Sequence, residues 1–244
     1  MIRGILAILF VLIFLTVSLI LIPIAYLIGL FDRHARDVYA QSLVAWGFRV
    51  IGVIVGAKVT EKGREKLPRG EAALYVANHR SIFDIVLLDA RMPAPTAIVA
   101  KKEIKKYLVL SWWMILKNCK FLDRNDIKQN LKIILECIDD AKKGQTILIY
   151  PEGTRSKAES ELDMGPFKEG SMKIALKSGV KVVPVAIHGT RELFEKHLPF
   201  IRPGKVTITY GDPIDPGTLD KEQQKHLGEI CRERILEMLK EQNK

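Results

Sequence analysis

The sequence predicts an α/β fold, in which a mixed but largely parallel sheet is flanked by helices and preceded by a hydrophobic two-helix membrane anchor. Short apolar runs of strand length alternate along the chain with segments of helical periodicity. No charged residue occurs between Gly4 and Phe31, and only Arg49 occurs between Val38 and Ala57, whereas the remainder of the chain is rich in charge. The 244 residues suffice for one compact domain and an appendage. We therefore expect an anchor over residues 1–57 and an α/β domain over residues 58–244.

The anchor is predicted to begin with the apolar run Ile2 to Leu30. As one helix, this run would extend roughly 40 Å, and the hydrocarbon core of a bilayer is about 30 Å thick. The run is longer than the apolar part of a signal peptide, and no small-residue cleavage site follows it. Pro23 is expected to kink the helix near its end.

A second apolar segment, Val38 to Val55, follows a polar turn at residues 32–37. It contains Gln41, Ser42 and Arg49, and such polar groups are costly at the centre of a bilayer. Two membrane arrangements remain open: a hairpin that crosses the bilayer, and two helices that lie in one leaflet. The second segment can also pack on the domain, and a buried hairpin in a soluble protein is the remaining alternative.

A basic cluster follows the second segment at Lys58, Lys62, Arg64 and Lys66. By the positive-inside rule, this cluster places the large domain on the cytoplasmic side of the membrane. The same cations can contact an anionic membrane surface. We therefore expect the protein at the cytoplasmic face of a membrane, which in a bacterium would be the inner membrane.

The domain is predicted to contain alternating strands and helices. The expected strands are Ala72–Ala77, Thr96–Ala100, Phe121–Leu122, Thr146–Tyr150, Val182–Ile187 and Val206–Tyr210. The expected helices are Ser81–Arg91, Trp112–Leu116, a helix capped by Asp126 and ended by Gly144, Gly170–Ser178, and Lys221–Gln242. In the helix after Asp126, apolar residues repeat at helical spacing at Ile127, Leu131, Ile134, Leu135 and Ile138. The last helix is expected to turn Leu227, Ile230, Ile235, Met238 and Leu239 inward.

The net charge of +10 draws the protein to nucleic acid, anionic lipid or phosphorylated substrates. The basic residues are scattered and not interleaved with stacking aromatics, which argues against a nucleic-acid partner. Cys119, Cys137 and Cys231 lie far apart and form no CxxC pair. A disulfide framework and a zinc site are therefore not expected, no metal is predicted, and a reducing compartment fits.

The motif with the clearest chemistry is NHRSIFD at residues 78–84, where a strand ends and a helix begins. His79 can take a proton from an alcohol near neutral pH and return it. Asp84 can hold one imidazole nitrogen only if His79 lies in the loop before the helix, since five helical residues turn by about 140°. The residues alone leave other roles open. His79 can be ordinary surface, and Asp84 can be the capping-box partner of Ser81.

Two further motifs carry polar groups at strand ends. FLDR at residues 121–124 offers Arg124, whose guanidinium suits phosphate oxygens, although for this motif alone a surface ion pair between neighbours is the better explanation. YPEGTRS at residues 150–156 brings together Glu152, Gly153, Thr154 and Arg155, a group that can hold a glycerol phosphate or form an ordinary polar turn. VPVAI at residues 183–187 reads as a buried strand without chemistry of its own.

In order, NHRSIFD, FLDR, YPEGTRS and VPVAI resemble the four sequence blocks of the glycerolipid acyltransferase family, especially its bacterial members that acylate 1-acyl-sn-glycerol 3-phosphate. The resemblance covers residues 71–188, and residues 167–170 (FKEG) follow the third block as in the family. Tyr150 stands where phenylalanine is commoner, and Lys120 and Leu122 differ from the usual second block. These departures leave the chemistry intact but weaken any inference about acyl preference.

The resemblance implies roles for individual residues. His79 would be the general base on the acceptor hydroxyl, and Asp84 would orient it. Arg124, Glu152, Gly153, Thr154 and Arg155 would form the substrate site for phosphate and glycerol. The family often places another phosphate contact between the first two blocks, where Lys105 is our choice within Lys101–Lys106; a solvated helix face explains these lysines equally well.

The implied reaction transfers a fatty acyl group from acyl-CoA or acyl-carrier protein to the sn-2 hydroxyl of lysophosphatidic acid, which gives phosphatidic acid. No cofactor and no covalent acyl-enzyme are implied. Acceptors such as glycerol 3-phosphate or another lysophospholipid remain an alternative. A membrane-binding scaffold that retains the fold without catalysis is a further alternative, and the presence of both His79 and Asp84 argues against it.

Overall fold

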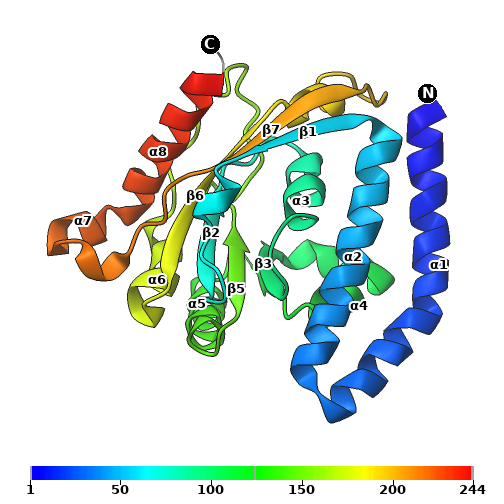
Figure 1. Cartoon of the computed structure of the whole chain (residues 1–244), viewed down its shortest axis with the longest axis horizontal. Helices are drawn as coiled ribbons and strands as arrows, with labels where there is room; N and C mark the ends of the chain where they lie inside the picture. Colours follow the sequence, from blue (N-terminus) through cyan, green and yellow to red (C-terminus); the bar gives the residue numbers. More distant parts are fainter. Residues whose placement is uncertain (1, 124, 243–244) are drawn as a thin grey trace.

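The computed structural model describes residues 2–123 and 125–242 and is centred on a seven-stranded sheet in the order β1-β7-β6-β2-β5-β3-β4 (Figure 1). The strands are β1 (Ala57–Lys62), β2 (Ala73–Ala77), β3 (Thr96–Lys101), β4 (Lys120–Leu122), β5 (Thr146–Ile149), β6 (Lys181–His188) and β7 (Gly204–Tyr210). Strands β2 to β6 are parallel to their neighbours, β7 is antiparallel to β6, and β1 is parallel to β7. The predicted mixed, largely parallel sheet is confirmed.

Helices cover both faces of the sheet. They are α1 (Ile2–Phe31), α2 (Arg33–Val55), α3 (Ile82–Asp89), α4 (Leu108–Leu116), α5 (Ile127–Lys142), α6 (Lys173–Ser178), α7 (Lys221–Lys225) and α8 (Leu227–Gln242). Short 3₁₀ turns are η1 (Arg64–Lys66), η2 (Lys102–Lys106), η3 (Glu169–Met172), η4 (Thr190–Leu193) and η5 (Pro216–Thr218). Helices α2 and α3 bury apolar side chains against one face of the sheet, while α5, α6 and α8 pack on the other. Strands β2 and β5, which lie between these two apolar layers, are fully buried, as central parallel strands require.

Strand β1 was not predicted from the sequence. Its residues AKVTEK alternate between half-buried and exposed positions, and its lysines were assigned to the membrane surface. The strand lies at the edge of the sheet, where charged side chains on the outer face protect the unpaired backbone from other chains. The basic cluster after the anchor therefore belongs in part to the sheet itself.

The carboxy-terminal segment differs from the single helix that was predicted over residues 221–242. The short helix α7 starts at a capping box formed by Asp220 and Gln223, and the chain breaks at His226 before α8 begins. In α8, the apolar face points inward as expected, with Leu227, Ile235 and Leu239 buried. The predicted helix over residues 170–178 is likewise divided, into η3 and α6.

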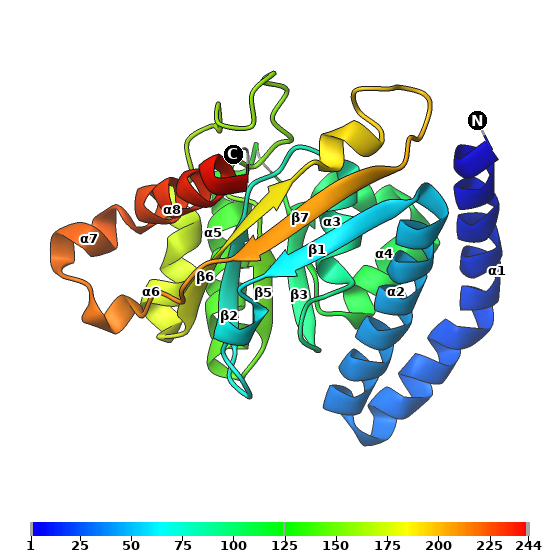
Figure 2. The same ribbon diagram turned by 45° about the horizontal axis from the view of Figure 1, so that its top comes forward.

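The anchor helices form an antiparallel pair along one flank of the domain (Figure 2). Both are long and apolar enough to cross a membrane by length and composition, and most of α1 is exposed. Helix α2 packs on α3 and α4 of the domain as well as on α1, and α1 also contacts α4 directly. Gln41 on α2 donates to the Asp89 backbone carbonyl at 3.2 Å. This polar residue, which disfavours a lipid environment, is therefore explained by contact with the domain.

Helix α5 carries an apolar stripe that the sequence pattern alone would have placed in the core. Cys137, Ile138 and Ala141 are its buried residues, whereas Ile127 and Leu131 are exposed. The stripe of residues 127, 131 and 135 lies on the face of α5 away from the sheet. Helical spacing identified the helix correctly but did not identify which of its faces is buried.

Candidate active site

The first, third and fourth sequence blocks meet at the carboxyl ends of three neighbouring strands. Strand β2 lies between β5 and β6, and all three are parallel, so the residues that follow them emerge at the same edge of the sheet. His79 follows β2, Tyr150 follows β5, and His188 ends β6. Loops at this edge are the usual place for a site in an open α/β sheet.

His79 and Asp84 form a hydrogen-bonded pair, with 2.8 Å between His79 Nδ1 and Asp84 Oδ2. His79 lies in the loop before α3, as the five-residue spacing required, while Asp84 lies in the first turn of that helix. No described residue hydrogen-bonds to His79 Nε2. With Nδ1 held by a carboxylate, Nε2 is the nitrogen left to exchange a proton with a bound molecule.

The Asp84 carboxylate is buried and accepts three further hydrogen bonds. Its Oδ2 accepts the backbone N–H groups of Arg80 at 2.6 Å and Ser81 at 2.7 Å, and its Oδ1 accepts the Thr190 hydroxyl at 2.5 Å. The capping role of Asp84 toward Ser81 is therefore real, and it coexists with the bond to His79. With this many donors, the carboxylate is fixed in position, and so is the imidazole that it holds.

Residues of the third block hydrogen-bond to both the backbone N–H and the backbone carbonyl of His79. Glu152 Oε1 accepts the His79 N–H at 2.8 Å, and the Ser156 N–H donates to the His79 carbonyl at 2.8 Å. The other oxygen of Glu152 accepts the Gly165 N–H at 3.3 Å. Burial raises the pKa of Glu152 above its ordinary value, although these two amides oppose the rise. Glu152, predicted to contact substrate, thus has both oxygens on protein amides.

Two further contacts fix the histidine. The Asn78 side chain donates to the Ile187 carbonyl at 2.9 Å and accepts the Ile187 N–H at 2.8 Å, which ties the ends of β2 and β6 together. The Tyr150 ring lies against the imidazole of His79, with the ring centres 4.4 Å apart. Burial, with smaller contributions from Asp84 and another carboxylate, raises the pKa of Tyr150 well above its ordinary value, so its phenol stays protonated.

Arg155 lies at the exposed edge of the site, where its guanidinium is 3.2 Å from a carboxylate oxygen of Glu195. The same carboxylate accepts the Ser81 hydroxyl at 2.6 Å and the Ile82 N–H at 2.9 Å. The Phe83 N–H is bound by the Ser81 hydroxyl oxygen. All backbone N–H groups from Arg80 to Phe83 are therefore occupied in this structure, and the start of α3 offers no free donor to a substrate oxygen.

The rest of the third block surrounds Gly153, which has a φ of 71°, a conformation that favours glycine. A Cβ atom there would come within 3.1 Å of the Lys168 ammonium, so this lysine from the FKEG segment covers the turn. Thr154 is exposed next to it. The Lys168 ammonium therefore lies over Gly153, and the Thr154 hydroxyl and the Arg155 guanidinium follow directly in the sequence.

Lys105 projects from η2 onto the second block, with its ammonium 5.0 Å from the centre of the Phe121 ring. Lys102 forms an ion pair with Asp123 in the same place. Two lysines therefore gather at the carboxyl end of β4. Arg124, predicted to bind phosphate, lies outside the described residues.

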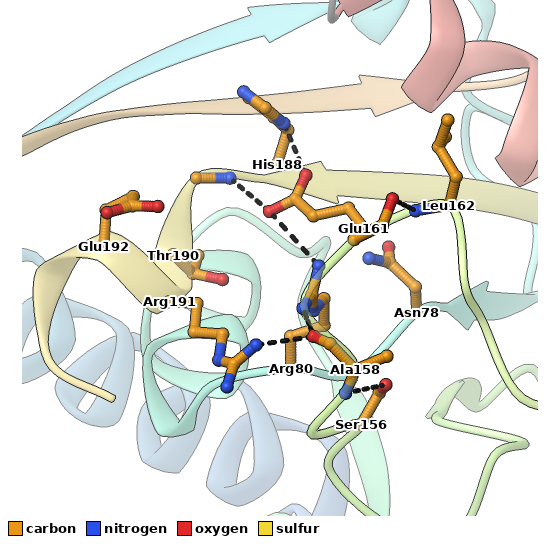
Figure 3. A network of polar contacts seen from close by, with 12 residues as sticks. Asn78, Arg80, Ser156, Ala158, Glu161, Leu162, His188, Thr190, Arg191 and Glu192 are labelled. Atoms are coloured by element: carbon orange, nitrogen blue, oxygen red, sulfur yellow. Dashed lines mark hydrogen bonds and ion pairs between the residues drawn. The ribbon is translucent and has the colours of Figure 1, made fainter. Parts of the chain in front are cut away.

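A second polar network holds residues 156–165 beside the site (Figure 3). The Arg80 and Arg191 guanidinium groups both donate to the Ala158 carbonyl, the latter at 2.5 Å. Glu161 accepts the Gly189 N–H at 3.2 Å and lies 2.5 Å from His188 Nδ1. We call residues 156–165 the strap.

The contact between His188 and Glu161 shifts the pKa of both groups. The hydrogen bond to Glu161 raises the pKa of His188, although burial opposes it. Burial would raise the pKa of Glu161, but the bond to His188, with the amide and cations nearby, outweighs burial and lowers it. The two groups are therefore an ion pair over an extended pH range.

Thr190, Glu195 and Asn78 were not among the predicted site residues. Asn78 lies in the first block and its position beside His79 was a usable signal. Thr190 and Glu195 lie more than 100 residues from Asp84 and Ser81, which they bind, in and after η4, where no motif marks them. Among residues 2–123 and 125–242, no group of three His, Cys, Asp or Glu side chains is placed to hold a metal ion; the absence of a metal remains an expectation.

Comparisons with known proteins agree with this geometry. The model of a family described as Acyltransferase matches residues 58–188. A 1-acyl-sn-glycerol-3-phosphate acyltransferase of Saccharomyces cerevisiae is 30% identical over 207 residues, which are 82% of this chain and 68% of that protein. A protein of the same name from Cocos nucifera is 32% identical over 80% of this chain and 62% of its own length.

A bacterial relative and a solved structure extend the comparison. The Borreliella burgdorferi protein of that name is 27% identical over 76% of this chain and 73% of its own length. The crystal structure of the 1-acyl-sn-glycerophosphate (LPA) acyltransferase PlsC from Thermotoga maritima matches with a TM-score of 0.75 and 29% identity, over 98% of both chains. The match to that structure includes the anchor helices as well as the domain.

Proposed function

The chain belongs to the acyltransferase family, and from this premise we propose that it transfers a fatty acyl group to the sn-2 hydroxyl of 1-acyl-sn-glycerol 3-phosphate, giving phosphatidic acid. The relatives named above support this acceptor, and the donor would be a thioester of CoA or of acyl-carrier protein. The observation that carries the proposal is the His79–Asp84 pair, which leaves Nε2 of the imidazole without a described partner.

The proposed reaction needs one base and no covalent intermediate. His79 Nε2 takes the proton of the acceptor hydroxyl as its oxygen attacks the thioester carbonyl carbon. The new C–O bond forms, the C–S bond breaks, and the departing thiolate takes the proton back from the imidazole. General-base catalysis of this kind contributes roughly 10²–10⁴-fold to the rate, and positioning of the two substrates contributes much of the rest.

The acceptor phosphate would lie on the cations beside His79. Arg155 is the cation of the third block with an exposed guanidinium, and Lys168 covers the same turn. Lys105, and Arg124 by resemblance, would serve the phosphate or the donor from the second block. Glu152 would act on the acceptor only indirectly, because both of its oxygens hold backbone amides.

The proposed membrane arrangement places the anchor in one leaflet at the cytoplasmic face of the inner membrane. Helix α1 exposes most of its apolar surface, while α2 contacts α3 and α4, so lipid cannot surround α2. Arg49 on α2 is exposed as well, and a charged side chain is costly in the bilayer centre. These features favour a monotopic anchor over a hairpin that crosses the bilayer.

A test of the function assays the purified full-length protein with each donor and each acceptor. Labelled acyl-CoA and acyl-carrier protein would be combined with lysophosphatidic acid, glycerol 3-phosphate or lysophosphatidylcholine. We expect phosphatidic acid from lysophosphatidic acid, and none from the H79A variant, since the loss of the base removes the proton path.

The control is H226A, which removes an exposed histidine between α7 and α8 and should leave the rate unchanged. A folded H79A variant, shown by an unchanged thermal transition, that still turns over normally would rule out the role of His79. Equal turnover of glycerol 3-phosphate would instead move the acceptor to that class.

A further inference from the structure

The segment after η4 forms an ordered turn whose tip is apolar and exposed. The Phe200 N–H donates to the His197 carbonyl at 2.7 Å, and the Arg202 N–H donates to the Leu193 carbonyl at 2.9 Å. These bonds close the turn upon itself. At its tip, Leu198 is 62% exposed and Phe200 is 49% exposed. The turn thus holds two large apolar side chains outward, an arrangement typical of a surface that contacts a membrane or another protein.

The turn lies beside the first turn of α1. Pro203 at its end and Arg3 of α1 both contact Gly56, where an added Cβ would come within 2.8 Å of each. Arg3 also donates to the Ile54 carbonyl at 2.8 Å, which fixes this end of α1 to α2. Figure 2 shows the gold turn next to the amino-terminal end of α1. The apolar tip is therefore on the same side of the molecule as the amino-terminal end of α1, where Ile2 is also exposed.

The same turn also reaches the catalytic pair. Glu195, three residues before Leu198, accepts the Ile82 N–H at 2.9 Å, and Ile82 is itself exposed. Phe194 packs edge-on against Phe83 of α3, with the ring centres 6.3 Å apart. The apolar tip is thus joined through a few residues to the helix that carries Asp84.

The charge around the tip is positive. Arg202 and Lys205 are exposed, and neither forms an ion pair with any described residue. Lys196 is exposed too and pairs with Glu192. Apolar side chains flanked by unpaired cations match the boundary between anionic head groups and acyl chains. A purely polar partner would leave Leu198 and Phe200 in water.

We propose that Leu198 and Phe200 insert into the head-group region of an anionic bilayer as a second membrane contact, separate from the anchor helices. This inference rests on the proposed acylation of a membrane lipid. It deepens that proposal, because a tip held in the membrane beside Ile82 fixes the site at the depth where a lysolipid presents its head group. The lysolipid then reaches His79 without leaving the interface.

The first experiment measures insertion directly and needs no turnover. All three native cysteines are buried, so a single engineered cysteine can be labelled in the folded, full-length protein. F200C would carry an environment-sensitive fluorophore, and the protein would be bound to phosphatidylglycerol vesicles containing nitroxide lipid. The matched control is L135C, since Leu135 is 53% exposed on α5, which packs on the opposite face of the sheet.

We expect a blue shift and strong nitroxide quenching for the label at position 200 and little of either at position 135. Equal quenching at the two positions overturns the proposal. So does a blue shift without quenching that grows with protein concentration, because that result assigns the tip to a second protein copy. Failure of the acyltransfer assay with intact quenching would reject the proposed function and leave the membrane contact standing.

The second experiment separates insertion from folding. The double variant L198S/F200S should lose activity toward lysolipid embedded in vesicles, yet keep its activity toward a short-chain, water-soluble lysolipid. A loss that is equal for both substrates means that the turn has a structural role only, and it also overturns the proposal.

Discussion

Among single side chains, Arg155 gives the clearest prediction, because its guanidinium is exposed at the edge of the site and is expected to bind the acceptor phosphate. Its side chain is 52% exposed and is held on one side by Glu195. It directly precedes Ser156, the residue of the third block whose N–H binds the His79 carbonyl. For R155A we expect the KM for lysophosphatidic acid to rise about tenfold or more, since a hydrogen bond to a charged group contributes about 1.5–3 kcal/mol. The KM for the thioester donor should stay unchanged in the same initial-rate measurements.

K157A serves as the control for this prediction, because Lys157 is exposed two residues away in the strap and should have no effect on either constant. If R155A raised the donor constant instead, the phosphate that Arg155 binds would belong to the donor and the placement of the acceptor would be wrong.

The sequence predicted the contact between His79 and Asp84 better than it predicted the residues that hold this pair in place. A spacing of five residues required His79 to precede the helix, and α3 does begin at Ile82. The motif could not reveal that Asp84 also binds Thr190, because that contact depends on how β6 and η4 return beside β2. Glu152 was assigned to substrate from its place in a polar turn, whereas its oxygens hold amides that only the folded chain brings near.

At the scale of a segment, the stability contributed by the strap should depend on pH, because the strap is held by His188. The pKa of His188 is raised by Glu161, so its stabilising contribution is complete below the unfolded value near 6.5 and is lost as pH rises through the folded value. The pKa of Glu161 is lowered, so its contribution is lost only as pH falls through that lower value. The ion pair is therefore strongest between about pH 5 and 6.5.

For H188Q we expect a loss of about 1 kcal/mol in the free energy of unfolding at pH 6, a discounted value for a partly exposed pair. The difference from the parent protein should shrink toward pH 9. Urea unfolding at the two pH values measures it. H197Q, which alters a histidine 3.9 Å from Glu192 outside the strap, is the control, and an H188Q deficit that grows with pH would contradict the sign.

Most helices and strands followed from periodicity and end signals, and two points at which the sequence misled, strand β1 and the buried face of α5, share a physical cause. Strand β1 is half-buried at a sheet edge and contains more charged than apolar side chains, so its pattern is that of a surface segment. In α5, the exposed stripe has the same spacing as a buried face. Local sequence carries the period of an element, but which face meets the core is decided by its neighbours.

The stability of the whole molecule depends on a buried polar cluster at the contact between the anchor helices and the domain. Lys117 and Asp89 are both buried and lie 2.5 Å apart, and Gln41 of α2 contacts Asp89 as well. For K117M we expect a loss of about 3–5 kcal/mol in stability, because Asp89 would be left as an uncompensated buried charge. Thermal unfolding in detergent measures it.

The double variant K117M/D89L should recover most of that loss, because it removes both charges together. K128M on the exposed surface of α5 is the reference substitution. A K117M variant as stable as K128M would mean that Asp89 does not depend on Lys117 for its burial.

The two hydrogen bonds to the backbone of His79 limit how much the third block can vary in length. Glu152 and Ser156 bind the N–H and the carbonyl of the same residue, His79, so the stretch between them must bridge a fixed span. Adding or removing one amino acid between them would release at least one of the two bonds, even if every side chain were kept. The separation of these two residues is thus as much a requirement for a well-placed imidazole as their identities are.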